Sequence, residues 1–564
     1  MSSLPPGIVM LLGGLVLALL RGRSAAIGAL LLPALSLAHL LSLPEGTYSL
    51  VEMFGYALEV RIDGLSLVWG YIFHGAAFLS ALYALHVRDT TQHVAAMLYA
   101  GSAIGAVFSG DMISLFVYWE ITAISSVFLI WASRTPESYK VGLRYLVIQV
   151  GSGVLLLAGV LVRVQETGSI TFESLGSLDN IGNLLIFFSF GIKCAFPFLH
   201  NWLQDSYPQA TPTGTVFLSA FTTKLAVYAL ARGFAGTEVL ITIGVVMTLF
   251  PIFFAVIEND LRKVLAYSLN NQLGFMVVGI GIGTEMSLNG TAAHAFCHIL
   301  YKALLFMSMG AVLYRTGTCK ATELGGLFRS MPITAVCCII GAMSISAFPL
   351  FSGFVSKSMI LTAAADGHHF WIWLGLVIAS AGVMEHSGIK IPFFAFFAHD
   401  SGKRVKEAPL HMLIAMCISA FLCVAIGVYP DALYAILPYE VNFEPYTGAH
   451  VITQFQLLLF AMLAFIVLLK TRSYPDEVDA INLDTDVVYR RWLPSLWRIL
   501  VVDFGGAARR AITGTVMGAV NACVEEVSRH HRPDGILAKP WTTGGMVIWA
   551  PALLGFYLLM QLFF

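Results

Sequence analysis

Apolar runs long enough to cross a lipid bilayer recur along the whole chain, and they constrain its fold class more than any other feature. The hydrocarbon core of a bilayer is about 30 Å thick, and a helix of roughly 20 residues spans it. Continuous apolar stretches such as 184–198 and 451–469 lack the alternation of a transmembrane barrel strand. The sequence therefore predicts an all-α, polytopic transmembrane helical bundle with about 14–16 spans. The runs lie at 7–20, 24–43, 64–85, 93–109, 112–132, 141–162, 183–199, 213–232, 237–257, 264–283, 290–314, 331–365, 370–397, 410–428, 451–469 and 546–564.

The composition agrees with a membrane protein and excludes several functions. Of 564 residues, 58% are hydrophobic and 12% are charged, and the mean hydropathy of +0.80 lies outside the range of soluble domains. The net charge of -1 offers no general attraction for nucleic acid. The cysteines show no zinc spacing, and there is neither a Walker A loop nor a dinucleotide-binding glycine motif. We expect no cofactor, no metal and no enzymatic reaction, so that energy comes from an ion gradient or a partner.

The charges between the runs predict the side that each loop faces, because cytoplasmic loops are enriched in Lys and Arg. Counting 331–365 as one broken helix places the basic loops on one side, whereas loops 45–63 and 430–450 are net acidic. We expect a multi-pass protein of the bacterial cell (inner) membrane with its N-terminus outside. The basic residues of the predicted cytoplasmic loops are Arg21, Arg23, Arg88, Arg134, Lys140, Arg262, Lys263, Arg315, Lys320, Arg329, Lys403, Arg404, Lys406, Lys470 and Arg472.

A series of ionisable residues lies near the middle of the predicted helices. In hydrocarbon each costs several kcal/mol, so each needs a partner, a water-filled cavity or a function. Four of them are lysines in separate helices, and snorkelling to the surface does not account for all four. We predict that the series carries protons or monovalent cations. Its members are Glu120, Lys193, Lys224, His294, His298, Lys302 and Lys390.

Two groups within this series have a spacing that suggests a role. His294, His298 and Lys302 follow one another at intervals of four and so share one helical face. A proton relay suits them, since His titrates near neutral pH and burial favours the neutral form of Lys; a metal site is the alternative, but no third ligand has the right spacing. Glu120 is the natural countercharge for Lys193, and opening that pair would release a proton. Structural pairing without transport remains the alternative.

Two distant segments resemble each other, SFGIKCAFPFLH at 189–200 and SGIKIPFFAFFAH at 387–399. A proline after a buried lysine breaks the helix and frees carbonyls beside a hydrated cavity; we expect such breaks at Pro197, Pro349 and Pro392. Paired broken helices mark a transport site and favour two inverted five-helix repeats, although chance similarity of apolar sequence is the alternative. The expected domains are N-terminal helices at 1–91, repeats at 92–233 and 234–400, and C-terminal helices at 401–473.

Five motifs resemble those of the antiporter-like subunits shared by Mrp-type cation/proton antiporters, respiratory NADH:quinone oxidoreductase and membrane-bound hydrogenases. The resemblance covers roughly residues 60–430, and the motifs SGFVSKSMI and SGIKIPFFAFFAHDSG look most like the D-type subunit of Mrp antiporters. It implies an ion pair of Glu120 with Lys193, a central relay of Lys224 with the His294 and His298 region, and a distal protonation site at Lys390. The motifs are DMISLFVYWE at 111–120, KCAFPFLHNWLQDSYPQATP at 193–212, DLRKVLAYSLNNQLG at 260–274, HAFCHILYKALL at 294–305 and SGFVSK at 352–357.

The region 474–545 carries arginines among apolar residues and is not a span. We expect it to form an amphipathic, lateral segment on the cytoplasmic side, notably at 506–530, with 546–564 as a terminal anchor. A plain surface linker is the alternative. A lateral helix followed by an anchor resembles one of the complex I subunits more than a minimal D-type subunit.

Two functions remain open. The first is an ion-translocating subunit of a multisubunit Na⁺ or K⁺/proton antiporter, with other membrane subunits, H⁺ and Na⁺ or K⁺, and the lipid bilayer as its partners. The second is a proton-pumping module of a redox or inorganic-carbon-uptake complex. A scaffold without transport would tolerate neutralisation of the buried charges.

Overall fold

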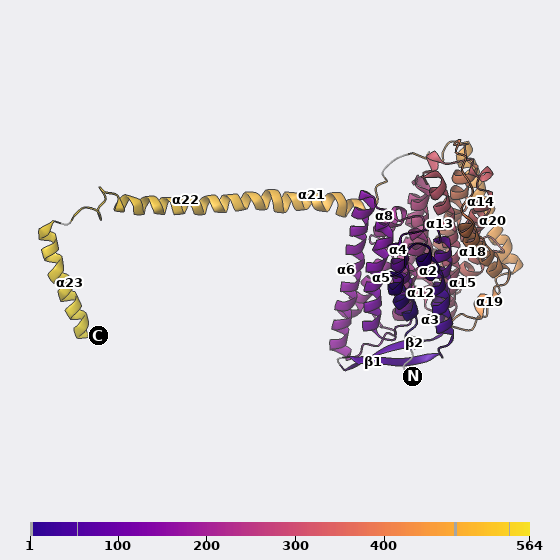
Figure 1. The fold of residues 1–564 in the computed structure, drawn as a ribbon, viewed down its shortest axis with the longest axis horizontal. Coiled ribbons are helices and arrows are strands. Elements are labelled where there is room, and N and C mark those ends of the chain that lie inside the picture. Colours follow the sequence, from indigo (N-terminus) through magenta and orange to yellow (C-terminus); the bar gives the residue numbers. More distant parts are fainter. Residues whose placement is uncertain (1–3, 54, 476, 479–481, 541, 564) are drawn as a thin grey trace. The chain divides into compact units, whose positions relative to one another are not determined.

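Helices make up most of the described chain, as the apolar runs predict. The computed structural model describes residues 4–53, 55–475, 477–478, 482–540 and 542–563. Among these residues, eleven helices are long and apolar enough to cross a membrane, and Ile8–Leu17, Ile181–Lys193 and Pro332–Ile345 are shorter apolar helices. The prediction of a polytopic helical membrane protein is confirmed. The chain forms two units, the bundle unit Met1–Asn482 and the C-terminal unit Leu483–Phe564 (Figure 1).

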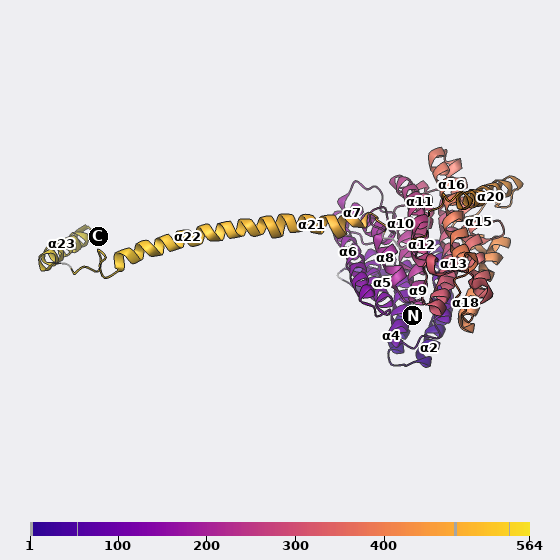
Figure 2. The same cartoon turned by 90° about the horizontal axis from the view of Figure 1, so that it is seen from above.

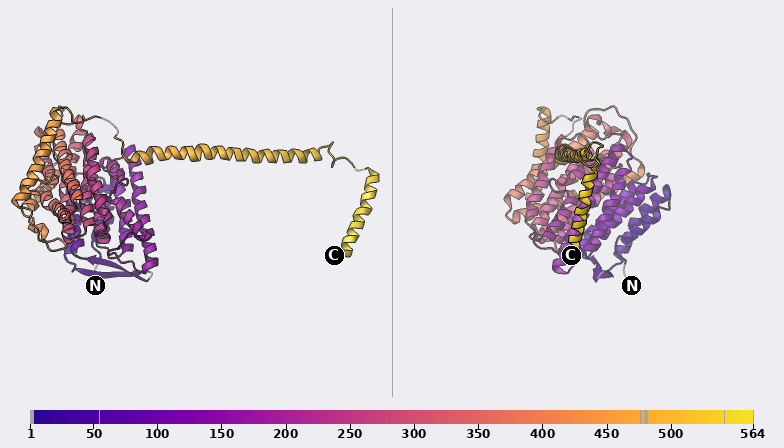
Figure 3. Two further views of the ribbon diagram at one scale, coloured as in Figure 1. Left: turned by 180° about the vertical axis from the view of Figure 1, so that it is seen from behind. Right: turned by 90° about the vertical axis from the view of Figure 1, so that its left-hand side faces the viewer.

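The bundle unit begins with three helices and a β-hairpin. Strands β1 and β2 pair antiparallel, with Gly46 opposite Ile62 and an irregularity between Ser49 and Val51. The hairpin lies at the same end of the bundle unit as the N-terminus (Figures 1 and 3). The elements are α1 Ile8–Leu17, α2 Arg23–Leu41, β1 Gly46–Met53, β2 Tyr56–Ile62 and α3 Gly64–Tyr83.

Two groups of helices follow, and they lie almost entirely in the ranges 92–233 and 234–400, for which two five-helix repeats remain a prediction. The first group consists of α4 Thr90–Val107, α5 Met112–Trp131, α6 Pro136–Thr167, α7 Ile181–Lys193 with α8 Asn201–Gln209, and α9 Gly214–Ala220 with α10 Thr222–Gly233. The second consists of α11 Val239–Ile257, α12 Leu261–Ile282, α13 Glu285–Thr316, α14 Pro332–Ile345 with α15 Ser352–Asp366, and α16 Phe370–Val383 with η3 Met384–Ile389, α17 Lys390–Pro392 and η4 Phe393–Phe397. Short 3₁₀ turns, η1 Ala321–Glu323 and η2 Leu327–Arg329, connect α13 to α14.

The bundle unit closes with three helices, and the C-terminal unit contains a long uninterrupted helical segment. The closing helices are α18 Leu410–Val428, α19 Asp431–Tyr434 and α20 Gly448–Lys470. The segment consists of η5 Val488–Trp492, α21 Leu493–Trp497, η6 Arg498–Phe504 and α22 Gly505–His531, and α23 Thr543–Phe563 follows it. Helix α22 coincides with the predicted amphipathic stretch 506–530, and α23 is long and apolar enough to span a membrane.

Polar residues in the loops determine where many helices begin. Asp111 accepts a hydrogen bond from the Ser114 N–H at the start of α5, and Asp260 accepts one from the Arg262 N–H at the start of α12. Thr135 and Ser138 form a reciprocal capping box at the start of α6. These side chains satisfy N–H groups that have no partner within the helix. The caps therefore set the entry points of helices that carry candidate site residues.

The fourth helix of each group is broken in the same way. Between α7 and α8, Ala195 and Phe198 have positive φ, and between α14 and α15 so do Ala347 and Leu350. The N–H of Phe196 bonds the carbonyl of Gly191, and the N–H of Phe348 bonds the carbonyl of Met343. Each break is thus a helix end closed by a left-handed residue, followed by a proline. Pro197 and Pro349 lie in these two breaks.

The structural counterpart of the first break is therefore 345–352 rather than 387–399, the segment that the sequence similarity had suggested. The break motifs themselves are alike, AFPF at 195–198 and AFPL at 347–350. Around Pro392 the helix continues instead of breaking, because π-helical turns flank α17 on both sides. Such wide turns accommodate a residue that lacks an N–H and crowds the preceding turn.

The core of the bundle unit lies around α13 and the α9–α10 span. In the most apolar 18-residue stretch of each helix, 89% of α13 and all of α9–α10 is buried, but only 17% of α20. Figure 2 shows α13 among α12, α15 and α18, and α9 and α10 beside α8 and α12. Ionisable residues on these inner helices are therefore enclosed by protein rather than by lipid.

Candidate functional site

Glu120 of α5 and Lys193, the last residue of α7, are electrostatic neighbours. Lys193 is fully buried, and its Nζ donates to the carbonyl of Trp119 at 2.6 Å while lying 4.3 Å from the centre of the Trp119 ring. Among the described residues, Oε1 of Glu120 has no hydrogen-bond partner. The ammonium is therefore held by a carbonyl and an indole ring, and the interaction with the carboxylate acts through space.

Lys224 lies in the first turn of α10, next to the discontinuity between α9 and α10 at Phe221. Its Nζ donates to the carbonyl of Ser219 at 2.6 Å and to Oγ1 of Thr223 at 3.3 Å. The carbonyl of Ser219 lies in the last turn of α9, where helical carbonyls lack a following N–H. The indole of Trp69 in α3 in turn donates to the carbonyl of Lys224 at 3.0 Å. A buried ammonium thus closes a helix end inside the bundle unit.

His294, His298 and Lys302 lie on α13 and are fully buried. Nδ1 of His294 is 3.1 Å from Oγ of Ser356, and the ring centres of the two histidines are 6.3 Å apart. Both ring nitrogens of His298 and Nζ of Lys302 are buried without a hydrogen-bond partner in the described part of the chain. Because buried polar groups normally find a partner, these three atoms are suited to bind water.

A polar network on α12 adjoins this face and was not among the predicted site residues. The hydroxyl of Tyr301 donates to Oε1 of Gln272 at 3.2 Å, and Nε2 of Gln272 donates to Oδ1 of Asn271 at 2.6 Å. Asn271 in turn donates to the carbonyl of Thr248 in α11. Three consecutive amides, completed by Asn270, interrupt the otherwise apolar run 264–283, which is a signal that the sequence already carries.

Lys357 of α15 is another residue outside the predicted set, although it ends the motif SGFVSK. It is buried, its Nζ donates to the carbonyl of Ile345 at 3.1 Å, and it lies 4.9 Å from the centre of the Phe275 ring. Ile345 is the last residue of α14, so this ammonium closes the second broken helix. The sequence signal that could have identified Lys357 is its position as a lysine within the apolar run 331–365.

Lys390 in α17 is the one residue of the predicted set that forms a direct ion pair in the described part of the chain. Its Nζ lies 2.8 Å from Oε1 of Glu477, and it donates to the carbonyls of Val256 at 2.6 Å and Glu258 at 2.8 Å. Glu477 follows α20 in a segment that the sequence analysis had assigned to the lateral region. The structure places this carboxylate in the bundle unit instead.

Electrostatic interactions connect these residues into a series. Lys224 interacts with His294, His298 and Lys302. His386 of η3 interacts with Lys302 and Lys357 on one side and with Lys390 on the other. His386 is buried and was absent from the predicted set. His386 thus connects Lys390 to the group that contains Lys224, His294, His298 and Lys302, whereas Glu120 and Lys193 lie near Trp119.

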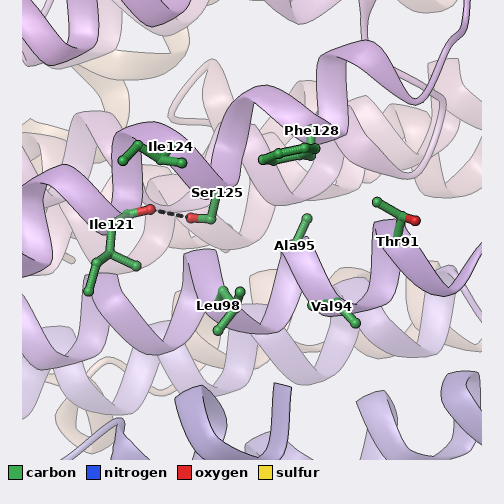
Figure 4. Close-up of a pocket in the computed structure, with 8 residues that line it drawn as sticks. All are labelled: Thr91, Val94, Ala95, Leu98, Ile121, Ile124, Ser125 and Phe128. Carbon is green, nitrogen blue, oxygen red and sulfur yellow. Dashed lines mark hydrogen bonds between the residues drawn. The ribbon is translucent and has the colours of Figure 1, made fainter. Parts of the chain in front are cut away.

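An apolar cavity of 310 Å³ between α4 and α5 lies outside this series. Its lining contains no ionisable side chain, and the hydroxyl of Ser125 already donates to the carbonyl of Ile121 (Figure 4). Such a cavity offers no group that could exchange a proton. Among the described residues there is also no cluster of three His, Cys, Asp or Glu side chains that could hold a metal ion.

The fold and the buried series define a class: a polytopic membrane protein with ionisable groups at broken helices. Residues 109–382 match the family model described as NADH:quinone oxidoreductase/Mrp antiporter, TM. Over these residues the chain is therefore similar to the transmembrane part that NADH:quinone oxidoreductase and Mrp antiporter subunits share.

Two curated relatives carry the name of an antiporter component. The A-type subunit of the Na⁺/H⁺ antiporter of Alkalihalophilus pseudofirmus is 30% identical over 70% of this chain and 55% of its own length. The A1-type subunit of the Na⁺/H⁺ antiporter of Staphylococcus aureus is 27% identical over 69% of this chain and 54% of its own length. The chain thus spans about half the length of these relatives. Both names specify the A type, so the predicted resemblance to the D-type subunit is not confirmed.

Two solved structures share the fold. One chain of the Mrp complex from Dietzia sp. DQ12-45-1b has a TM-score of 0.70 at 19% identity, over 82% of this chain and 98% of that chain. One chain of the membrane-bound sulfane sulfur reductase, an archaeal respiratory membrane complex, has a TM-score of 0.70 at 20% identity, over 98% of this chain and 99% of that chain.

Proposed function

We propose that this chain is an ion-translocating subunit of a multisubunit Na⁺ or K⁺/proton antiporter and is not itself an enzyme. The observation that carries the proposal is the set of four buried lysines, Lys193, Lys224, Lys302 and Lys357, which form no ion pair among the described residues. An unpaired buried ammonium readily gives up its proton. A series of such groups, connected by histidines, is suited to pass protons stepwise.

In this proposal the distance between the Glu120 carboxylate and the Lys193 ammonium changes during transport. When the carboxylate approaches the ammonium, both charges are stabilised and Lys193 keeps its proton. When the carboxylate withdraws, only neutral groups, the carbonyl and the ring of Trp119, hold Lys193. Proton release from Lys193 then feeds the groups around Lys224 and α13.

The names of the curated relatives support a cation/proton antiporter, and we propose that the protein lies in a bacterial cell (inner) membrane. Other membrane subunits would be its partners, in line with the titles of the structures that share its fold. That the chain is the D-type subunit of such a complex remains a prediction. The relatives are named as A-type subunits instead.

A proton-pumping module of a redox complex is the second candidate, and one observation favours it. One chain of the archaeal respiratory membrane complex matches 98% of this chain, which includes part of the C-terminal unit, whereas the Mrp chain matches 82%. In that case a soluble redox partner, and no cation gradient, would supply the energy.

Cation-dependent proton flux in vesicles that carry the whole complex tests the first candidate. We expect Lys193→Ala and Glu120→Ala each to abolish Na⁺- or K⁺-dependent flux at matched assembly levels. Flux that requires a reductant and ignores both cations would favour the redox module. Unchanged flux in both variants would contradict transport through the buried series and favour a scaffold.

A further inference from the structure

Glu477 is a buried carboxylate in a segment that follows the last helix of the bundle unit. Only 8% of its side chain is exposed, and Oε1 lies 2.8 Å from Nζ of Lys390, which is fully buried. Burying an ion pair costs several kcal/mol of desolvation per ion, so such a pair contributes little net stability. The pair therefore calls for an explanation other than stabilisation of the fold.

A cavity joins Glu477 to the end of the bundle unit that carries the basic loops. It has a volume of 340 Å³, and its lining includes Glu477, Tyr474, Arg472, His399 and Thr322. Arg472 and the nearby Lys320 belong to loops that the charge distribution places in the cytoplasm. At roughly 30 Å³ per molecule in liquid water, the cavity has room for several waters. Glu477 thus lies between Lys390 and a cavity that is lined by both polar and apolar side chains.

The polar and charged groups around the pair come from the loop after α11, from α12, from η3 and from the segment after α20. Glu258, after α11, forms an ion pair of 2.9 Å with Lys263 of α12 and accepts a hydrogen bond from Asn482 at 3.3 Å. Glu385 of η3 interacts electrostatically with Lys390. Glu258 is therefore neutralised by its own lysine, which leaves Glu477 as the carboxylate in direct contact with Lys390.

Two further polar groups face the pair. The hydroxyl of Tyr474 and Nε2 of His386 are buried without a hydrogen-bond partner among the described residues. Burial raises the pKa of the Glu477 carboxyl above its usual range, although the ammonium of Lys390 acts in the opposite direction. A carboxyl of this kind binds and releases protons closer to neutral pH than a carboxyl in water.

We propose that Glu477 is the group that exchanges protons between Lys390 and water in this cavity. The ammonium of Lys390 gives a proton to Oε1 of Glu477, which leaves a neutral amine and a carboxylic acid. The acid then releases the proton to water and becomes a carboxylate again, and loading of Lys390 follows the reverse steps. This inference rests on the proposed function, since it supplies the cytoplasmic end of the buried series.

The test compares Glu477→Gln with wild type in vesicles that carry the whole complex. Gln preserves the size of the side chain and can still accept a hydrogen bond from Lys390, but it cannot carry a proton. We expect cation-dependent proton flux to fall by at least about tenfold at matched assembly. The control Glu444→Gln changes an exposed carboxylate and should leave flux unchanged. Flux of Glu477→Gln within about twofold of that control would overturn the proposal.

A conservative variant covers the case in which Glu477→Gln does not assemble. Glu477→Asp keeps the carboxylate but draws it back from Lys390 by one methylene. We expect flux to persist with a shifted dependence on pH between about pH 6 and pH 9. An unchanged pH profile would show that the carboxyl takes no part in proton exchange.

Infrared spectroscopy separates this inference from the proposed function. In pH-difference spectra of the purified complex, we expect a carboxylic acid C=O band that disappears in Glu477→Gln and persists in Lys193→Ala. If the wild type shows this band without any cation-dependent flux, the antiporter proposal fails and proton exchange at Glu477 stands. If wild-type flux is present but Glu477→Gln loses neither flux nor band, the exchange role fails alone.

Discussion

Gly153 of α6 leaves open the space that the carboxylate of Glu120 occupies. A Cβ atom at Gly153 would overlap Oε1 of Glu120 and press on Cδ and Cγ of the same side chain. The overlapping atoms form the end of a flexible side chain, so a methyl group there would push the carboxylate aside and leave the helices in place. Gly153 thus determines where the Glu120 carboxylate can lie relative to Lys193.

We expect Gly153→Ala to lower cation-dependent proton flux by about tenfold or more, although it alters no ionisable group. Displacing the Glu120 carboxylate changes the field at Lys193, and proton transfer depends on the distance between charges. The measurement is flux in vesicles at matched assembly levels. Gly151→Ala is the matched control, because nothing lies within 4 Å of a Cβ at Gly151. Equal flux in the two variants would show that the carboxylate position is unimportant.

Lys224→Met tests whether the ammonium at the α9–α10 discontinuity takes part in transport. Methionine has a similar length but neither donates to Ser219 nor carries a proton. We expect flux to fall by at least about tenfold, while the complex still assembles, because Thr222 and Tyr99 continue to connect the helix to α4 through hydrogen bonds of 2.7 and 3.0 Å. The control Lys140→Met changes an exposed lysine. Retained flux in Lys224→Met would remove Lys224 from the path.

The sequence predicted the helical membrane fold because the length and apolar character of each run suffice to identify a helix that can cross a bilayer. It also located most of the buried lysines, since an ionisable residue in an apolar run is visible at once. Lys357 is not in the predicted set because it ends the polar motif SGFVSK, where the apolar run 331–365 is interrupted. Asn270, Asn271 and Gln272 escaped because uncharged amides interrupt an apolar run less conspicuously than charges do.

Glu477 could not be predicted from its position. It lies in a charged segment after the last helix of the bundle unit, where most carboxylates are solvated, and only the tertiary fold brings it to Lys390. The pairing of the two broken helices was also missed. A short apolar motif, AFPF or AFPL, carries less sequence signal than Gly-Ile-Lys, yet it is the motif that adopts positive φ at both breaks.

Ala347→Val tests the left-handed conformation at the second break. Ala347 has a φ of 57°, and a β-branched side chain is disfavoured there because its second branch crowds the backbone. We expect the free energy of unfolding to fall by about 1–2 kcal/mol. Ala347→Gly should change it by less than about 0.5 kcal/mol, since glycine accepts positive φ but adds chain entropy. Thermal unfolding of the purified complex measures both. The control Ala365→Val lies at an exposed helical position, and an equal loss in that variant would remove the conformational explanation.

Asp63 precedes α3 and follows the β-hairpin, and its ion pair allows the electrostatics of that end of the bundle unit to be tested. It forms an ion pair of 2.7 Å with Arg232. Burial alone would raise the pKa of Asp63, but hydrogen bonds and charge from Arg232, together with Ser66, outweigh burial and hold the pKa below its usual range. The stabilisation is therefore present above the unfolded pKa of about 3.9 and is lost as the pH falls through the folded pKa.

Asp63→Asn should consequently lower the free energy of unfolding at pH 7, and by less than about 1 kcal/mol because 38% of the Asp63 side chain is exposed to solvent screening. The difference from wild type should shrink as the pH falls below about 4, where wild-type Asp63 itself becomes protonated. Thermal midpoints of the purified complex at a series of pH values measure this convergence. Asp366→Asn, at an exposed position, should match wild type throughout. A constant difference between Asp63→Asn and wild type across the series would indicate lost packing or capping at the start of α3, and not a lost charge interaction.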